Sequence, residues 1–362
     1  MKKLYAAIII TLLFSFCCCA QKRTTFTNPL LPSGADPWSI YKDGYYYYTN
    51  TFGDRLVIWK TKSIADLKTA PRKTVFLPSK GKGYSKDLWA PELHFINHKW
   101  YLYFAADSGR NESHRIWVLE NASPDPLKGE WILKGKVADS SDKWAIDASV
   151  FKHKDQLYMI WSGWEGDTNG RQDIYIGKMK NPWTLEGKRV RLSSPNLDWE
   201  QHGDLHDPYN PPHVNVNEGP EFLQHGDRVF LIYSASGCWT DFYALGMLST
   251  HADNNLLDSA SWAKSPQPVF KESVENGVYA PGHNSFFKSP DGTQDWILYH
   301  ANAAPGQGCG KHRSPRAQSF TWNADGSPNF GEPVKAGVPL FVPSEKKTKR
   351  KVTNRSMPVV NE

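Results

Sequence analysis

The sequence predicts an all-β fold, a five-bladed β-propeller whose four-stranded antiparallel blades surround a central channel. The first observation is that short runs rich in aromatic and β-branched residues, which strands prefer, occur five times. These runs are YYYYTN at 45–50, WYLYFAA at 100–106, LYMIWSG at 157–163, VFLIYSA at 229–235 and WILYHAN at 296–302. The second observation is their spacing of roughly 55 to 72 residues, which suits repeated blades.

The third observation is that a hairpin opens every unit and a third strand follows it. A polar turn precedes each aromatic run, and another extended stretch precedes the turn. These first stretches are DPWSI, PELHF, DASVF, EGPEF and HNSFF. The candidates for the third strand are RLVIWKT, RIWVLEN, DIYIGKM, YALGMLS and RAQSFTW, and a short outer segment such as KTVFLP or GEWILKGK usually completes the unit.

Two other fold classes agree less well with the sequence. Beyond the N-terminus no long apolar stripe has the period of about 3.6 residues that an amphipathic helix requires, and 25 prolines and 27 glycines interrupt almost every run. A two-sheet sandwich could also hold many short strands. However, fivefold similarity in a chain of 362 residues favours the propeller.

The chain divides into a leader, one domain and a tail. Residues 1–20 have the lysines, the apolar run and the small final residues of a signal peptide, and the run is short for a membrane span. Cleavage after Ala20 would release a soluble protein, whereas lipidation of a cysteine at 17–19, as in a lipoprotein leader, would leave a lipid anchor. Residues 24–344 form the predicted propeller and residues 345–362 a basic polar tail. We expect an exported protein that is periplasmic, extracellular or lipid-anchored at the cell surface.

Cysteine content and charge exclude several classes of protein. Outside the leader only Cys238 and Cys309 remain, so they could form one bridge or stay as thiols, but no disulfide framework. The net charge of +6 comes partly from the leader and from EKKTKRK at 345–351. This run could suggest nucleic acid, but the leader indicates export, so we expect no nucleic acid as a partner, and membrane contact only through a lipid anchor. No glycine-rich phosphate loop, metal-spaced cysteine cluster or GxSxG motif supports nucleotide, structural zinc or serine hydrolase chemistry.

The first strands are expected to bring carboxylates together, because the first strand of each propeller blade lines the central channel. Counting back four residues from the bulky apolar residue that closes each first strand gives Asp36, Pro91, Asp147, Glu218 and His283. Carboxylates in one cavity repel one another, so at least one should keep its proton to a higher pH than usual. A protonated and an ionised carboxyl group are what hydrolysis of a glycosidic bond requires.

With these residues in view, the chain resembles glycoside hydrolase family 43, five-bladed propeller enzymes that act mainly on arabinose- and xylose-containing plant polysaccharides. The resemblance runs from about Asn28 to Val342 and is carried by GADPWSIYKDGYYYYT, LWAPELHFINHKWYLYF, IDASVFKHKDQLYMIWSG, NEGPEFLQHGDRVFLIYS, YAPGHNSFF and RAQSFTWNADGSPNFGEPV. It implies that Asp36 is the general base, Glu218 the general acid, and Asp147 the residue that tunes the pKa of the acid and orients it. Because the family inverts configuration, we expect the base and acid carboxyls to lie roughly 6.5 to 9.5 Å apart.

The same resemblance assigns further residues to the substrate site. His283 matches a histidine of blade five that lies beneath the sugar, in many members beside a calcium or sodium ion. We therefore expect it in the channel, where it could contact a metal, although no cofactor should be required. Arg316 stands where family members have an arginine that reaches the sugar or steadies the carboxylates, with Arg313 as its competitor. Trp89 and Trp164 flank strands, so they could stack on the sugar at the channel mouth or could be packing residues.

The stretches SASGCWTDFYALGML and CGKHRSPRAQSFTWNADGSPNFGEPV look most like those of exo-acting α-L-arabinofuranosidases. The expected function is therefore release, with inversion, of terminal arabinofuranose from arabinan or arabinoxylan side chains, and the expected partner is an arabinose- or xylose-containing polysaccharide or oligosaccharide. A β-xylosidase or endo-arabinanase of the same fold, and a catalytically silent glycan-binding propeller, stay open as alternatives. The NDPNG block of invertase-like propellers and the repeated S-x-D-x-G-x-T-W boxes of sialidase-like ones are absent. The polar loop at 199–220 could form a wall of the pocket.

Strand alternation separates the two glutamates of NEGPEF. Glu221 lies three residues after Glu218, so its side chain is expected on the opposite face, in an inter-blade layer with structural hydrogen bonds. A β-bulge at Gly219-Pro220 would overturn this prediction.

Overall fold

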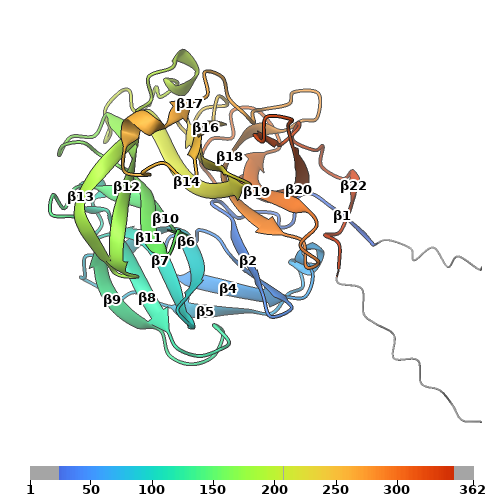
Figure 1. Cartoon of the computed structure of the whole chain (residues 1–362), viewed down its shortest axis with the longest axis horizontal. Coiled ribbons are helices and arrows are strands. Elements are labelled where there is room, and N and C mark those ends of the chain that lie inside the picture. Colours follow the sequence, from blue (N-terminus) through green and yellow to red (C-terminus); the bar gives the residue numbers. More distant parts are fainter. Residues whose placement is uncertain (1–23, 207, 346–362) are drawn as a thin grey trace, which may run out of the picture.

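Five blades stand around a common axis in the part of the chain that the structure, a computed structural model, describes, residues 24–206 and 208–345 (Figure 1). From blue to red in Figure 1, the blades follow one another around the ring in sequence order. Each blade has four strands whose neighbours run antiparallel, so the predicted five-bladed propeller is confirmed for the described residues. A short parallel pairing of β12 with β14 joins blades three and four into one eight-stranded sheet. The predicted leader at 1–20 and residues 346–362 of the predicted tail lie outside the described residues.

The strands follow the predicted order of four per blade. Blade one holds β2 (Trp38–Lys42), β3 (Tyr45–Thr49), β4 (Leu56–Thr61) and β5 (Arg72–Phe76). Blade two holds β6 (Lys86–Ile96), β7 (Lys99–Asp107), β8 (Arg115–Asn121) and β9 (Ile132–Val137), and blade three holds β10 (Ala145–His153), β11 (Gln156–Gly163), β12 (Arg171–Asn181) and β13 (Thr184–Ser193). Blade four holds β14 (Asn215–His225), β15 (Arg228–Ala235), β16 (Ala244–His251) and β17 (Ala263–Lys264). Blade five holds β18 (Tyr279–Lys288), β19 (Asp295–Asn302), β20 (Ser314–Trp322) and β21 (Pro328–Asn329).

Helical structure within the described residues is limited to short 3₁₀ segments. These are η1 (Ile64–Asp66), η2 (Asn111–Ser113), η3 (Asp198–Glu200) and η4 (Ser259–Ser261). None of the helices in this part of the chain has the length and apolar character needed to cross a membrane.

The strands are continuously apolar because both faces of a blade are buried against its neighbours. In β3, Tyr46 and Tyr48 pack in a cluster with Leu298 of blade five, whereas Tyr47 packs against Trp100 of blade two. Corresponding clusters lie between the remaining pairs of adjacent blades. Each blade is therefore held from both sides, which fixes its first strand at the central axis.

The two ends of the described chain close the ring. Strand β1 (Thr25–Thr27) pairs antiparallel with β22 (Pro339–Phe341), which follows blade five. Asn28 then imitates a strand residue, because its Nδ2 donates to the carbonyl of Ala317 at 3.0 Å and its Oδ1 accepts from the Ala317 N–H at 2.9 Å. The chain that leads into blade one is thus held against blade five, and this places Asp36 between the two blades.

A residue with positive φ lies just before the first strand of blade one and inside the first strand of each of the other blades. These residues are Asp36 at 56°, Ala90 at 43°, Asp147 at 56°, Gly219 at 54° and His283 at 46°. In β6, β10, β14 and β18 the pairing register shifts around this residue, which makes it a β-bulge. A bulge frees a backbone N–H, and in four blades a side chain of the neighbouring blade accepts it. The pairs are Asp36 with His300 Nδ1 at 3.1 Å, Ala90 with Thr51 Oγ1 at 2.7 Å, Gly219 with Asp147 Oδ2 at 3.1 Å and His283 with Ser234 Oγ at 2.7 Å.

These bulges correct the predicted register in two blades. The prediction matched Pro91 and Glu218 to Asp36, but the residues that share its backbone geometry are Ala90 and Gly219. The count was therefore wrong by one residue in blades two and four. The bulge itself is the same in blades two to five, but the apolar residue chosen to close the strand is not equivalent, since Phe95 lies one residue farther from it and Phe222 one residue nearer than in the other blades.

Candidate active site

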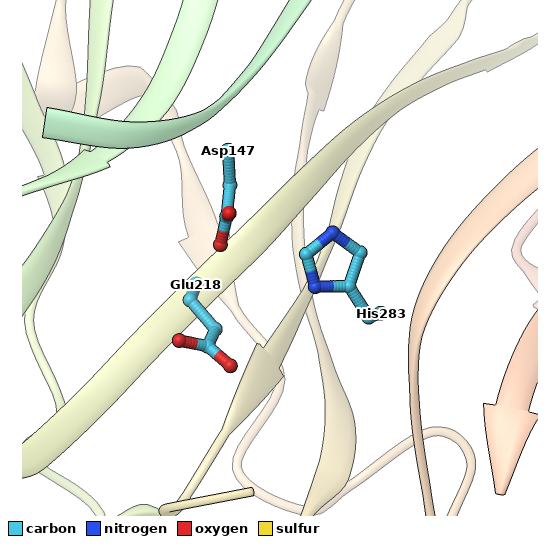
Figure 2. A group of neighbouring side chains, drawn as sticks. All are labelled: Asp147, Glu218 and His283. Carbon is cyan, nitrogen blue, oxygen red and sulfur yellow. The ribbon is translucent and has the colours of Figure 1, made fainter. Parts of the chain in front are cut away.

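The first strands meet at a cavity of about 550 Å³. In blade three both the bulge residue Asp147 and the preceding Ile146 line it. A bulge thus turns two successive residues toward the cavity, the positive-φ residue and the one before it. In blade four the positive-φ residue is Gly219, so the residue before it, Glu218, also lines the cavity. Figure 2 shows Asp147, Glu218 and His283 pointing toward one another from β10, β14 and β18. The predicted gathering of Asp36, Asp147, Glu218 and His283 in one cavity is therefore what the fold produces.

Asp36 is buried among groups that favour its ionised form. Its Oδ2 accepts the Thr51 hydroxyl at 2.6 Å, and its Oδ1 lies 3.1 Å from Nη1 of Arg313. Burial alone would raise the pKa of Asp36, but His283, Arg313, His300 and the Thr51 hydrogen bond together hold that pKa well below its usual range. Since burial lowers the pKa of both histidines, Arg313 is the permanent positive charge near neutral pH. Asp36 is accordingly a carboxylate.

Glu218 and Asp147 have the opposite tendency. Burial raises the pKa of Glu218 to about 7; the Tyr243 hydrogen bond opposes this rise, the charge of Asp36 adds to it and Arg313 opposes it. Burial, and then repulsion from Glu218 and Asp36, raises the pKa of Asp147 well above its ordinary value. Carboxyls that interact this closely titrate as a pair, and this pair keeps a proton into the neutral range. One cavity thus holds an ionised carboxylate and a protonated carboxyl group.

His283 lies in the channel where the sequence placed it, with Nδ1 at 3.4 Å from Asp36 Oδ1. Its donor atom and one carboxylate oxygen each of Asp147 and Glu218 lie within 4.8 Å of one another. This set fits a resident Ca²⁺ poorly, since Ca²⁺ takes about six to eight oxygen ligands and Glu218 tends to hold its proton. We therefore assign no catalytic step to a metal, and contact of His283 with a channel ion stays a prediction.

Of the two candidate arginines, Arg313 and not Arg316 lies at the carboxylates. Arg316 lies in β20 opposite Tyr299, is 1% exposed and is not among the residues that line the cavity. Arg313, its competitor, stands just before the strand and reaches Asp36. The prediction that Arg316 contacts the sugar or the carboxylates is therefore corrected in favour of Arg313. The reason is strand geometry, because β20 turns Arg316 toward Tyr299 of the adjacent strand.

The two predicted tryptophans also differ in their placement. Trp89 lines the cavity, and its ring stacks on His114 with centroids 4.1 Å apart. Trp164 is 1% exposed and stacks on Trp144 at 4.8 Å, and it is Trp144 that lines the cavity. The interpretation of Trp164 as a sugar-stacking residue is corrected, because it supports another tryptophan from behind.

Sequence reasoning missed three residues that hold the carboxylates. Thr51 links blades one and two, since its hydroxyl accepts the Ala90 N–H and donates to Asp36. His300 accepts the Asp36 N–H, and Tyr243 donates to Glu218 Oε1 at 2.7 Å. A histidine inside the apolar run WILYHAN was the one available signal, because a polar residue buried in a strand requires a partner.

A disulfide between Cys238 and Cys309 joins the loops that follow β15 and β19. Of the two alternatives left open by the sequence, the structure therefore has the bridge. Both cysteines line the cavity, and so do Leu205, Asn210 and Val214 from the 199–220 loop, which forms a wall as expected.

Glu221 does not line the cavity, and it is buried at 8% exposure. Ser149 Oγ of blade three donates to Glu221 Oε2 at 3.2 Å, and the carboxyl groups of Glu221 and Glu92 interact. The predicted structural hydrogen bond is present. Ser149 comes from the neighbouring blade three, but Glu92 comes from blade two, which is not adjacent, so Glu221 lies toward the channel axis because the bulge at Gly219 shifts the alternation on which an inter-blade position was predicted.

Comparisons with known proteins agree with this architecture. Residues 26–328 match the family model described as "Glycosyl hydrolases family 43". The chain is 42% identical over 328 residues to a Streptomyces avermitilis protein named "Extracellular exo-alpha-(1->5)-L-arabinofuranosidase", which covers 88% of this chain and 66% of that protein. It is 39% identical over 287 residues to a Streptomyces chartreusis protein of the same name, covering 78% and 84% respectively. The crystal structure of an alpha-L-arabinofuranosidase from Lactobacillus brevis is similar with a TM-score of 0.79 at 37% identity, covering 86% of this chain and 98% of that one.

These matches differ in how much of each relative they include. The chain spans just under two thirds of the S. avermitilis protein, but nearly all of the L. brevis chain. The family match covers every blade and all four residues of the carboxylate and histidine cluster. The chain belongs to family 43 of the glycosyl hydrolases.

Proposed function

We propose that this protein is an inverting, exo-acting α-L-arabinofuranosidase that releases terminal arabinofuranose from arabinan or arabinoxylan side chains. The observation that carries the proposal is the pairing, in one cavity, of an ionised carboxylate, Asp36, with a carboxyl group on Glu218 whose pKa is about 7. An acid and a base that work together near neutral pH need such opposite protonation states. The names of the S. avermitilis, S. chartreusis and L. brevis relatives support arabinofuranose as the sugar.

In the proposed reaction Asp36 is the general base and Glu218 the general acid. A water molecule attacks the anomeric carbon and gives a proton to Asp36, while Glu218 gives its proton to the leaving oxygen as the glycosidic bond breaks. Arabinose leaves with inverted configuration, Asp36 ends protonated and Glu218 ionised, and exchange of one proton with solvent restores the starting state. Burial and repulsion from Glu218 and Asp36 keep Asp147 protonated as well, so the proton that Glu218 transfers is its own.

Binding of the sugar is assigned to residues that line the cavity and keep an accessible face. The indole of Trp89 offers an apolar surface of the kind that stacks on sugar rings, and His283 and Arg313 offer hydrogen-bond donors beside Asp36. Arabinose-containing glycans are therefore the proposed partners.

We also propose that the protein is exported. Two of its relatives are named extracellular, and the Cys238–Cys309 bridge is of the kind that persists in oxidising compartments. Free release and a lipid anchor on a cysteine at 17–19 are distinguished by metabolic labelling with radioactive palmitate, which only an anchored protein incorporates.

The proposal is tested with Glu218→Gln and Asp36→Asn on arabinan, arabinoxylan and 4-nitrophenyl arabinofuranoside, with sizing of the products. Each variant keeps the shape of the side chain but cannot donate or accept the proton. For Asp36→Asn, kcat should fall by about 10²- to 10⁴-fold on all three substrates. For Glu218→Gln the same fall is expected on arabinan and arabinoxylan, and a much smaller one on the aryl glycoside, because 4-nitrophenol leaves without a proton. The matched control is Glu186→Gln, an exposed glutamate of β13, which should keep full activity. Proton NMR of the first product should show the inverted anomer.

Other outcomes identify the alternatives. Xylose as the released sugar would indicate a β-xylosidase, and oligosaccharides as the first products would indicate an endo-arabinanase. Glycan binding without any product from the parent protein would indicate a silent propeller. A Glu218→Gln variant as fast as the parent on arabinan would contradict the assignment of the acid.

A further inference from the structure

Tyr243 is a fully buried tyrosine that the proposed acid–base reaction does not yet use. It stands just before β16, is 1% exposed, and its hydroxyl lies 2.7 Å from Glu218 Oε1. Burial and the nearby Glu218 charge raise the pKa of Tyr243 well above its ordinary value, so the phenol stays protonated and acts as a donor. Because Oε1 accepts this hydrogen bond, the proton that Glu218 delivers belongs on Oε2.

The ring of Tyr243 is held in place on two sides. It lies parallel to the ring of His300, at an interplanar angle of 2° with centroids 5.7 Å apart. Gly282 lies close beside it, since a Cβ at that position would come within 2.2 Å of Tyr243 Cε1. Space for the ring therefore depends on a residue without a side chain.

His300 connects this ring to the other catalytic carboxyl. Its Nδ1 accepts the backbone N–H of Asp36 at 3.1 Å, at the strained position with φ of 56°. Base and acid are thus linked through two parallel rings, in the order Asp36, His300, Tyr243, Glu218. A separation that leaves room for one water must be kept within a narrow range, and rigid aromatic rings provide such a spacing.

We propose that Tyr243 is a positioning residue that fixes the general acid, directing the proton of Glu218 to Oε2 and, with His300, holding the acid at its distance from Asp36. The proposal rests on the proposed function, since it assigns Glu218 the role of acid. It names a residue that acts through Glu218 and not on the substrate itself.

The leaving group decides how much this positioning matters. An arabinan chain leaves as an alcohol and needs the proton, whereas 4-nitrophenol departs as a stable anion without it. Removing the Tyr243 hydroxyl should therefore slow hydrolysis of arabino-oligosaccharides far more than hydrolysis of 4-nitrophenyl arabinofuranoside. A merely structural role would slow both substrates alike.

The experiment compares Tyr243→Phe with Tyr101→Phe on both substrates. Tyr101 is the matched control, because its hydroxyl donates to Glu120 Oε2 at the same 2.7 Å, but Glu120, unlike Glu218, does not line the cavity. For Tyr243→Phe we expect kcat on arabinotriose to fall by about 10- to 100-fold, with less than about a threefold change on the aryl substrate. The alkaline limb of the pH profile should move to higher pH, because the ionised form of Glu218 loses a hydrogen bond that stabilises it.

Two further measurements give an answer if Tyr243→Phe folds poorly or if the parent is inactive on arabinofuranosides. Gly282→Ala keeps the phenol but displaces it, and should show the same split between the two substrates. The Glu218 carboxyl signal in ¹³C NMR, identified by its loss in Glu218→Gln, should titrate at higher pH in Tyr243→Phe than in the parent, whatever the activity. An unchanged midpoint, or equal losses on both substrates in an active enzyme, would overturn the proposal. Absence of hydrolysis by the parent would instead reject the proposed function.

Discussion

At the scale of single residues, the ionised state of Asp36 depends on side chains from two parts of the ring. Thr51 follows the second strand of its own blade, whereas Arg313 and His300 belong to blade five. Arg313 matters most among them near neutral pH, because burial leaves His283 and His300 uncharged. The base thus works only while the closed ring holds blade five beside blade one.

Arg313→Ala should therefore weaken the base and change its pH dependence. Without the guanidinium, the pKa of Asp36 rises, so the acid limb of kcat/KM should move to higher pH. We expect kcat/KM at pH 6 to fall by roughly 10- to 100-fold, in line with the loss of a charge-assisted hydrogen bond. Full pH profiles check the shift, and Arg313→Lys should recover part of both effects. A profile that is lowered but not shifted would contradict this account of Asp36.

Site residues could be predicted from the sequence where they occupy a position that every blade repeats. They were harder to predict where two candidates lie close together in the chain and no repeat distinguishes them. Asp36, Asp147 and His283 occupy the corresponding positive-φ position of their blades, so a repeated pattern identified them. Arg313 and Arg316 are three residues apart, and only the start of β20 at Ser314 decides which of them is turned into the strand. No periodic signal marks that start.

At the scale of elements, strands were predictable because their aromatic runs are buried on both faces, but bulges were not. A bulge adds one residue and reverses every later side chain, while leaving the composition unchanged. This explains the misplaced environment of Glu221, whereas the register error in blades two and four came from the apolar residue chosen to close each first strand, because blades three and five have the same bulge. It also explains why Glu218 still reaches the cavity, because a bulge exposes two successive residues there.

The Cys238–Cys309 bridge is the element-scale device that holds the wall of the cavity. Each cysteine stands a few residues before a functional side chain, Tyr243 in one loop and Arg313 in the other. The double variant Cys238→Ser/Cys309→Ser should lose about 2–4 kcal/mol of stability, with a Tm lower by roughly 5–10 °C. Because both loops loosen, KM should rise several-fold. Calorimetry and steady-state kinetics test this. Reduction of the parent protein should reproduce both changes. An unchanged KM would show that the loops keep their positions without the disulfide.

At the scale of the whole molecule, apolar clusters between adjacent blades hold the first strands, with their buried polar groups, at the axis. These strands also carry a second acidic cluster, outside the cavity. Glu92 and Glu221 interact there, and His94 Nε2 lies 2.9 Å from Glu92 Oε2. Burial raises the pKa of Glu92 to about 8 and lowers the pKa of His94 to about 4. Near neutral pH both groups are therefore uncharged, and the Glu92 carboxyl can donate to the His94 ring.

This cluster should make stability fall as pH rises. Between the ordinary Glu pKa of 4.5 and the folded value of about 8, the folded protein keeps a proton on Glu92 that the unfolded chain releases, so the contribution is full below 4.5 and is lost as pH rises through 8. Glu92→Gln keeps the shape and the donor to His94 but cannot ionise. Its Tm relative to the parent should therefore increase from pH 5 to pH 8 by at least roughly 2 °C. The exposed Glu186→Gln control should follow the parent at every pH, and a Tm difference for Glu92→Gln that stays constant across this range would show that Glu92 does not hold its proton in the channel.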